Sequence, residues 1–161
     1  MNAEAGIRVL LGEVDKQEAV LAKITAFYDD YLRTTSGLEN RSAEQAIVVS
    51  EVFANYYTCL ETLFLRISQF FENALSADRW HQDLLHKMTL RVEGVREAVV
   101  SDATAAVLLE LLKFRHFKRY YFQFEYDWDQ LDYLRKKFEQ VRTAVTADLD
   151  RFRTFLNSLL P

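Results

Sequence analysis

The amino-acid sequence predicts an all-α fold, an antiparallel bundle of about five helices in a single domain over residues 1–161. Glycine and proline are scarce: four residues are glycine, and the one proline is the last residue. An all-β domain of this length would need many tight turns built on such residues, whereas helices run unbroken without proline. Half of the residues are apolar, and long stretches repeat them at spacings of three and four, which is the period of one helix face.

The first two helices are predicted at about residues 7–33 and 42–73. The first has a single apolar face, and the threonine, serine and glycine of residues 34–37 are typical of a helix end. The second begins with Ser42 and Gln45, which form a capping box. Its two overlapping apolar stripes indicate that it packs on more than one neighbour.

Three polar residues of the second helix are interpreted as structural. Cys59 lies among apolar residues, as a buried thiol does rather than a nucleophile, and no second cysteine exists to form a disulfide. Glu51 and Glu61 are separated by about 80° around the helix and about 15 Å along it. This separation is too large for a paired-carboxylate site, so both carboxylates are predicted to be solvated.

The other three helices are predicted at about residues 79–90, 103–121 and 128–158. Each is preceded by a residue that can cap its first turn: Asp78, Ser101 or Asp102, and Asp127. The last of these helices has the most regular apolar repeat in the chain, which favours antiparallel bundle packing.

Two connections separate these helices. Residues 91–100 are predicted to form a loop with Gly94 at a turn. From Tyr120 to Tyr126, aromatic residues alternate with other side chains, which indicates extended backbone before the last helix.

No cofactor, metal site, leader sequence or membrane span is predicted. His81 and His86 are about 140° apart around a helix, so their imidazoles cannot share a metal ion. The glycines are too dispersed for a phosphate-binding loop. The N-terminal segment lacks the basic region of a signal peptide, and no stretch approaches the roughly 18–20 apolar residues of a membrane span. We therefore expect a cytoplasmic protein.

The most unusual segment is residues 113–122. It holds a histidine and four cations, although the whole chain carries a net charge of −4: Lys113, Arg115, Lys118 and Arg119. Such a cluster can bind phosphate, and neighbouring aromatic rings can stack on unpaired bases, so these four cations are candidate RNA-binding residues. The alternative is a solvated cationic face, which the helix dipole favours at a C-terminus. The spacing leaves both interpretations open.

Over about residues 52–158 the chain resembles the HepT-like branch of the HEPN superfamily. The segments that carry the resemblance are 57–67 (YTCLETLFLRI), 80–88 (WHQDLLHKM), 94–96 (GVR), 112–119 (LKFRHFKR) and 124–131 (FEYDWDQL). The resemblance implies a HEPN-like helical bundle that forms a homodimer through its motif-bearing helices. HEPN proteins are commonly metal-independent ribonucleases. HepT is the toxin of a toxin–antitoxin pair, and its nucleotidyltransferase partner can modify a motif tyrosine with AMP.

The family motif is an arginine, four residues, a histidine, one residue and a tyrosine. Its arginine falls on Arg115, and Arg119 fits the phosphate-contact role. The histidine position is Tyr120, and the tyrosine position is Phe122, which has no hydroxyl to accept AMP. Attack by a ribose 2′-OH needs a proton acceptor near neutrality, which histidine supplies with a pKa of about 6.5, whereas tyrosine ordinarily has a pKa of about 10. Ribonuclease activity is therefore predicted to be weak or lost.

Three functions stay open from the sequence. The first is a HepT-like module that binds RNA or a nucleotidyltransferase partner through a cleft around Arg115 and Arg119. The second is an active endoribonuclease in which His116 or Tyr120 is catalytic with Arg115. His116 points about 100° away from Arg115 on a helix, so it can meet the arginines of a second subunit. The third is a helical dimerisation module without a nucleic-acid role.

Overall fold

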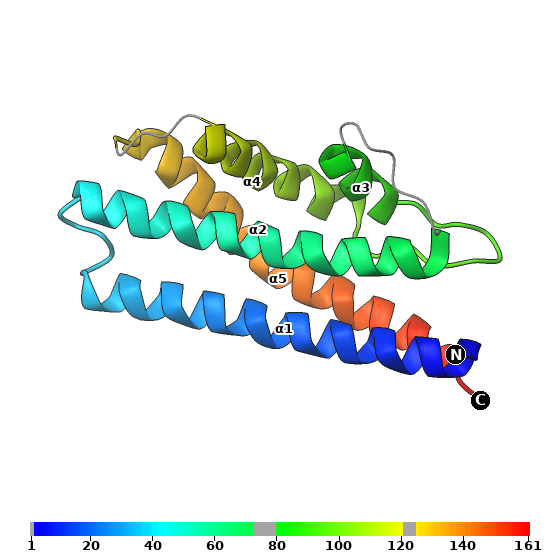
Figure 1. The fold of residues 1–161 in the computed structure, drawn as a ribbon. Helices are drawn as coiled ribbons and strands as arrows, with labels where there is room; N and C mark the ends of the chain where they lie inside the picture. The colour runs from blue at the N-terminus through cyan, green and yellow to red at the C-terminus, as the bar shows by residue number, and fades with distance from the viewer. Residues whose placement is uncertain (1, 73–79, 121–124) are drawn as a thin grey trace.

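The computed structural model describes residues 2–72, 80–120 and 125–161, and these form the predicted all-α bundle (Figure 1). Its helices begin and end within a few residues of the boundaries that the apolar spacing predicts. They are α1 Ala3–Thr34, α2 Ala43–Glu72, α3 Trp80–Met88, α4 Asp102–Tyr120 and α5 Trp128–Ser158. No helix in the described part of the chain is long and apolar enough to cross a membrane.

Helix α2 is the centre of the bundle, because it contacts each of the other four helices. Figure 1 shows α1 beside α2, with α4 and α3 on the other side of α2 and α5 crossing behind. Successive long helices run in opposite directions, so the bundle is antiparallel, as predicted. The prediction that the second helix packs on more than one neighbour is confirmed.

Aromatic rings join the three longest helices in the core. The ring of Phe138 on α5 lies 5.0 Å from those of Tyr28 and Tyr56 and 5.4 Å from that of Phe53. All four side chains are buried, and two of the three contacts with Phe138 have the edge-to-face geometry that aromatic rings prefer. These contacts fix α1 and α5 against α2, and they leave the remaining face of α2 to α3 and α4.

Most of the predicted helix starts are confirmed by their hydrogen bonds. The backbone N–H of Gln45 donates to Ser42 Oγ at 3.1 Å, and the Ser42 N–H reaches Gln45 Oε1 at 3.4 Å, which completes the capping box. Ser101 Oγ accepts from the backbone N–H of Thr104 at 3.1 Å. Asp127 likewise accepts from the first turn of α5 at 2.9 Å. Each bond satisfies a backbone donor that has no partner within its helix.

Two predictions on connections fall partly outside the described residues. Asp78, the expected cap of α3, lies there, as does the centre of the extended connection expected between Tyr120 and Tyr126. Tyr120 itself is the last residue of α4. The turn predicted at Gly94 is confirmed, because its φ of +72° lies in the left-handed region that glycine adopts without strain.

The loop after α3 is fixed by one buried side chain, Arg96. Its guanidinium donates to the carbonyl oxygens of Lys87 at 2.9 Å and Leu90 at 2.8 Å. It also donates through Nε to Glu72 Oε1 at 2.8 Å, near the end of α2. Arg96 therefore joins the end of α3, the loop and α2.

Candidate functional site

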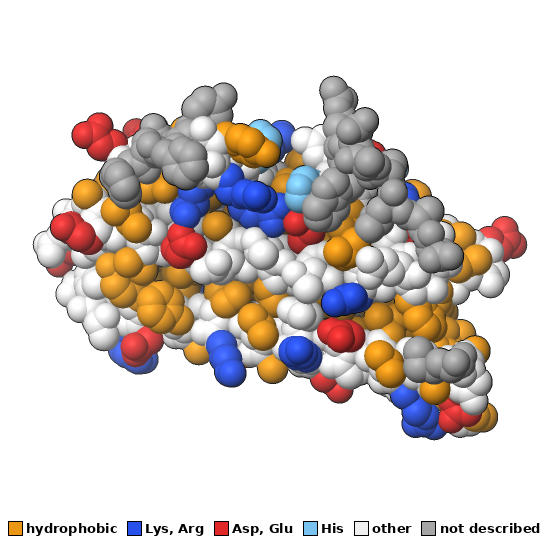
Figure 2. Space-filling view, in the orientation of Figure 1, with side chains coloured by type: hydrophobic (Ala, Val, Ile, Leu, Met, Phe, Trp, Pro, Cys, Tyr) orange, Lys and Arg blue, Asp and Glu red, His pale blue; other side chains and the backbone are white. Residues whose placement is uncertain are grey.

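The basic segment lies on the last turns of α4, where two pockets open against α2 and α3. The first has a volume of about 520 Å³ and the second about 430 Å³. His81, Arg115 and Arg119 line both pockets, so the pockets are adjacent, and we call the two together the α4 groove. Figure 2 shows lysine and arginine side chains gathered over this part of the molecule.

Arg115 forms the floor of the groove. Only 5% of the residue is exposed, because its side chain points from α4 toward α2. Its Nη1 donates to Thr58 Oγ1 at 3.1 Å and its Nη2 to Glu61 Oε1 at 2.9 Å. The guanidinium also lies over the ring of Tyr57, 5.2 Å from the centroid, a favourable cation–π contact. Arg115 is thus held in place by three side chains of α2.

The prediction that Glu61 is solvated is wrong, since this residue is only 7% exposed. Helices α3 and α4 cover this face of α2, and Arg115 compensates the buried carboxylate. A charge at this depth is stable only when it is paired and hydrogen-bonded. Glu51, by contrast, is exposed as predicted, and it pairs with Lys118.

His81 binds the second oxygen of the same carboxylate. Its Nδ1 lies 2.7 Å from Glu61 Oε2. An ionised carboxylate only accepts hydrogen bonds, so Nδ1 carries the hydrogen and donates it. Arg115 Nη2 also approaches Nδ1 at 3.3 Å, but this contact joins two donors and is not a hydrogen bond. Glu61 therefore holds both Arg115 and His81 in fixed orientations.

The other predicted site residues differ in their exposure. Lys113, His116 and Arg119 are exposed along the groove, and Tyr120 is 65% exposed at its end. The rings of His116 and Tyr120 lie against each other, with centroids 4.5 Å apart. Of the four candidate RNA-binding cations, Lys113 and Arg119 present their charge to solvent, whereas Arg115 and Lys118 are paired with glutamates of α2.

Two buried groups of α2 are held in their neutral forms, Tyr57 beneath Arg115 and Cys59 on the face toward α1. Burial raises the pKa of the Tyr57 hydroxyl, with a further increase from the nearby Glu61 carboxylate. Burial also raises the pKa of the Cys59 thiol to about 11, and the thiol donates to Gln17 Oε1 at 3.0 Å. The thiolate is the reactive form of cysteine, so Cys59 is structural, as predicted.

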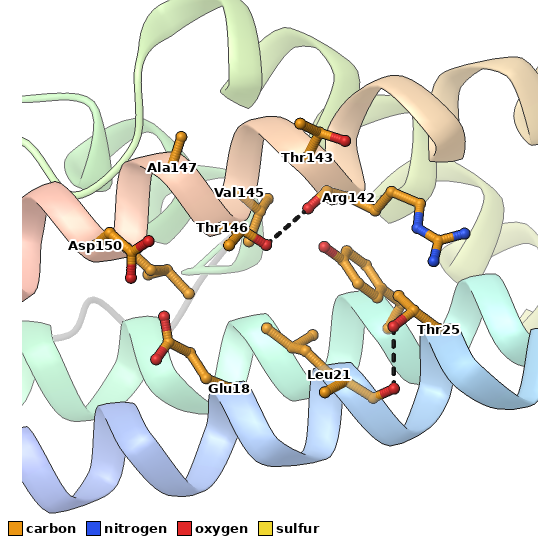
Figure 3. A pocket seen from close by; sticks show the side chains of 12 residues that line it. Glu18, Leu21, Thr25, Arg142, Thr143, Val145, Thr146, Ala147 and Asp150 are labelled. Atoms are coloured by element: carbon orange, nitrogen blue, oxygen red, sulfur yellow. Dashed lines mark hydrogen bonds between the residues drawn. The ribbon is translucent and has the colours of Figure 1, made fainter.

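A larger pocket of about 680 Å³ lies between α1 and α5 (Figure 3). The cation in its lining, Arg142, donates to both carboxylate oxygens of Asp29 at 2.6 and 2.7 Å. This pairing leaves little net positive charge for an anionic ligand. Across the described residues, no three histidine, cysteine, aspartate or glutamate side chains are close enough to share a metal ion.

Glu61, Thr58 and His81 are parts of the site that the sequence did not predict. Thr58 and Glu61 are three residues apart and therefore share a helix face, which was the available signal. That signal gives no indication of what covers the face. His81 gives no local signal of its role, because its partner Glu61 lies on a different helix.

A family model described as a HepT-like protein matches residues 48–156. The match covers helices α2 to α5 apart from their extreme ends, and it includes every residue of the α4 groove named above. No curated protein and no solved structure matches the chain.

Proposed function

The chain belongs to the HepT-like family of HEPN proteins, and on that premise we propose that it binds single-stranded RNA in the α4 groove. The observation that carries this proposal is the line of exposed cations, Lys113 and Arg119, along a groove whose floor is a third cation, Arg115. Neutralising phosphates and releasing their counterions is the main source of affinity for nucleic acid. The net negative charge of the chain does not oppose this, because the positive charge is local.

Within the groove, each exposed side chain has a separate role. Arg119 and Lys113 contact phosphates, and Arg119 can do so bidentately. Tyr120 offers an exposed ring on which an unpaired base stacks, a contact worth about 1–3 kcal/mol per base. Arg115 supports the floor through Glu61 and Thr58 rather than reaching the strand from solvent.

We also propose that the protein is the HEPN component of a toxin–antitoxin or related module in the cytoplasm. Its nucleotidyltransferase partner would contact the same groove, because the exposed cations Lys113 and Arg119 lie there. RNA and the partner then compete for one surface. We expect a nucleotidyltransferase to be encoded beside this chain. Its addition to the purified protein should displace bound RNA.

The proposal includes a homodimer, as the family resemblance implies. The resemblance implies an interface on the motif-bearing helices, but we propose a different face, because exposed apolar side chains of α1 and α2, among them Phe27, Val20 and Ile47, form an apolar area there. Covering such surface is favourable at about 25 cal/mol per Å². Light scattering should give the mass of two chains, and Phe27→Lys should shift the equilibrium toward the single chain.

The experiment that tests RNA binding is a double charge reversal, Lys113→Glu with Arg119→Glu. Fluorescence anisotropy of a labelled single-stranded RNA should show binding by the parent and its loss in this variant. The slope of log affinity against log salt should be about −0.7 for each phosphate neutralised. Lys16→Glu with Lys136→Glu changes the net charge equally at exposed positions of α1 and α5, and this control should bind as the parent does. Equal binding by both double variants would favour the dimerisation module without a nucleic-acid role.

A second candidate, an active endoribonuclease, is favoured by the contact between His116 and Tyr120 on the groove wall. It predicts RNA cleavage in the presence of EDTA that stops in His116→Ala or Tyr120→Phe. The principal proposal predicts weak cleavage because tyrosine stands at the motif histidine position. Tyr120→His should then increase the rate, whereas an unchanged rate would show that this position takes no part in cleavage.

A further inference from the structure

The pocket between α1 and α5 shares no lining residue with the α4 groove, and the proposed function makes no use of it (Figure 3). We propose that this pocket binds a small organic amine. The ammonium group would lie beside carboxylates at one end, the apolar body between the helices, and a hydrogen-bond acceptor of the ligand at Tyr56. This inference does not depend on RNA binding.

Tyr56 supplies a hydrogen-bond donor that the described part of the chain leaves without a partner. Only 1% of the residue is exposed, and its hydroxyl makes no hydrogen bond to any described residue. The Tyr57 hydroxyl also lacks a partner but is sealed from solvent, whereas the Tyr56 hydroxyl is not; because Tyr56 lines this pocket, its hydroxyl opens into it. Burial raises the pKa of the hydroxyl, so it keeps its hydrogen at neutral pH. A buried donor without a partner is costly, and an acceptor on a ligand would satisfy it.

Two threonines of the lining offer acceptors rather than donors. Figure 3 shows that Thr25 Oγ1 donates to the carbonyl oxygen of Ala22 and Thr146 Oγ1 to that of Arg142, each at 3.0 Å. A hydroxyl that has given its hydrogen to the backbone presents only lone pairs to a ligand. The wall therefore suits a ligand with N–H groups, and its apolar part suits a hydrocarbon body. The apolar lining comprises Leu21, Ala22, Val145, Ala147 and Leu149.

One end of the pocket carries excess negative charge. Glu18 and Asp150 lie there, as Figure 3 shows, and Arg153 donates to both of them and to Asp15. Three carboxylates thus share one guanidinium, which leaves two negative charges in excess within this cluster. An ammonium group placed beside Glu18 and Asp150 is attracted to them and can donate three hydrogen bonds.

The two ends of the pocket are spaced for a short ligand. The charge of Arg142 acts on the pKa of the Tyr56 hydroxyl, so this hydroxyl lies at the Arg142 end, which is also the Thr25 end in Figure 3. Seven residues of α1 separate Thr25 from Glu18, which is about 10 Å at the helical rise. N-acetylcadaverine, an amide and an ammonium joined by a pentamethylene chain, has about this length.

The test is calorimetric titration of the protein with N-acetylcadaverine and two probes of similar length. The parent should bind N-acetylcadaverine saturably. N-hexylacetamide has a methyl group in place of the ammonium and should bind more weakly by about 10-fold or more, because hydrogen bonds to charged groups are strong. Octylamine keeps the ammonium but has no carbonyl oxygen, so its binding should depend on the carboxylates and not on Tyr56.

Three variants locate the binding. Tyr56→Phe should weaken N-acetylcadaverine by about fivefold and leave octylamine unchanged, and its unfolding temperature should match that of the parent. Glu18→Gln should weaken both amines by about two- to fivefold, because Glu18 is partly exposed. Glu44→Gln makes the same charge change at an exposed position of α2, and this control should bind as the parent does.

Three results would overturn the proposal. The first is a folded parent that does not bind N-acetylcadaverine saturably. The second is equal affinity for N-acetylcadaverine in Tyr56→Phe and in the parent. The third is an equal loss in Glu18→Gln and Glu44→Gln, which would show attraction to the net negative charge of the chain rather than to this pocket. Thermal unfolding of each variant checks that the protein is folded during the titration.

Discussion

Arg96 and Arg115 are both buried arginines that pair with a glutamate of α2, yet their surroundings differ. Arg96 donates to backbone carbonyl oxygens as well as to Glu72, and the guanidinium lies in a closed junction between α2, α3 and the loop. Arg115 donates to side chains only, and it lies on the floor of an open groove with its Nε buried and without a hydrogen-bond partner among the described residues.

This difference shows that a buried arginine–glutamate pair can have two different roles. Carbonyl oxygens belong to the backbone, so an arginine that satisfies them fixes the path of the chain. Side-chain partners such as Glu61 hold groups that remain beside a pocket, where a ligand can reach them. Burial and pairing alone therefore do not distinguish the two arginines, whereas the kind of partner and the adjacent cavity do.

The largest expected effect is that of Arg96→Ala on stability. It leaves Glu72 with only Lys87 as a charge partner, at 3.9 Å, and it removes a donor from the carbonyl oxygens of Lys87, Leu90 and Glu97. Breaking a buried ion pair costs about 3–5 kcal/mol. Urea unfolding should show this loss, while the protein that remains folded binds RNA as before. Arg91→Ala, at an exposed pair with Glu97, is the control and should cost little. A small loss of stability in Arg96→Ala would show that this buried pair contributes no more than an exposed ion pair.

Arg115→Ala is expected to have a smaller effect on stability and a larger one on RNA. Glu61 is more buried than Glu72, but its carboxylate keeps the hydrogen bond with His81 at 2.7 Å, so the cost should be about 1–3 kcal/mol, as for an unsatisfied buried group. RNA affinity should fall because the groove loses the buried cation at its bottom. Adding Glu61→Gln removes the uncompensated charge and should recover part of the stability. A loss of stability as large as that caused by Arg96→Ala would contradict the proposed difference between the two arginines.

The smallest effect is expected at the exposed pair of Arg142 and Asp29. The hydrogen bonds from Arg142 lower the pKa of Asp29, so its stabilising contribution is present above the unfolded pKa of about 3.9. This contribution is lost as the pH falls through the lower pKa that Asp29 has in the folded protein. Because Asp29 is half-exposed, solvent screening limits the cost of Asp29→Asn at pH 7 to about 0–1 kcal/mol. The difference between variant and parent should vanish in unfolding measurements near pH 2; a difference that persists there would exclude the charge as its cause.

The fold was predictable because it depends on local patterns. Apolar spacing, the capping box at Ser42 and the left-handed turn at Gly94 each act over a few residues, and the structure confirms them. One detail was not predictable in this way: Leu159 continues the apolar repeat of α5 but is exposed, because the helix ends at Ser158.

The site was predictable only in part, because it depends on contacts between distant segments. The cationic run on α4 indicated a basic surface, and the structure brings Lys113, Arg115 and Arg119 to one groove. The burial of Glu61 could not be inferred from α2 alone, since a glutamate on a helix face is ordinarily solvated. Its partners stand 20 and 54 residues away in the sequence, and only the packing of α3 and α4 shows that they meet.

Helix α1 packs against α2 and α5 but lines neither pocket of the α4 groove, and the family match begins after it. A few inward residues, such as Leu10, Val14 and Tyr28, hold this helix on the bundle. Contacts made on its outward face can therefore change without touching a residue of the groove, so assembly through α1 and binding in the groove are physically separate.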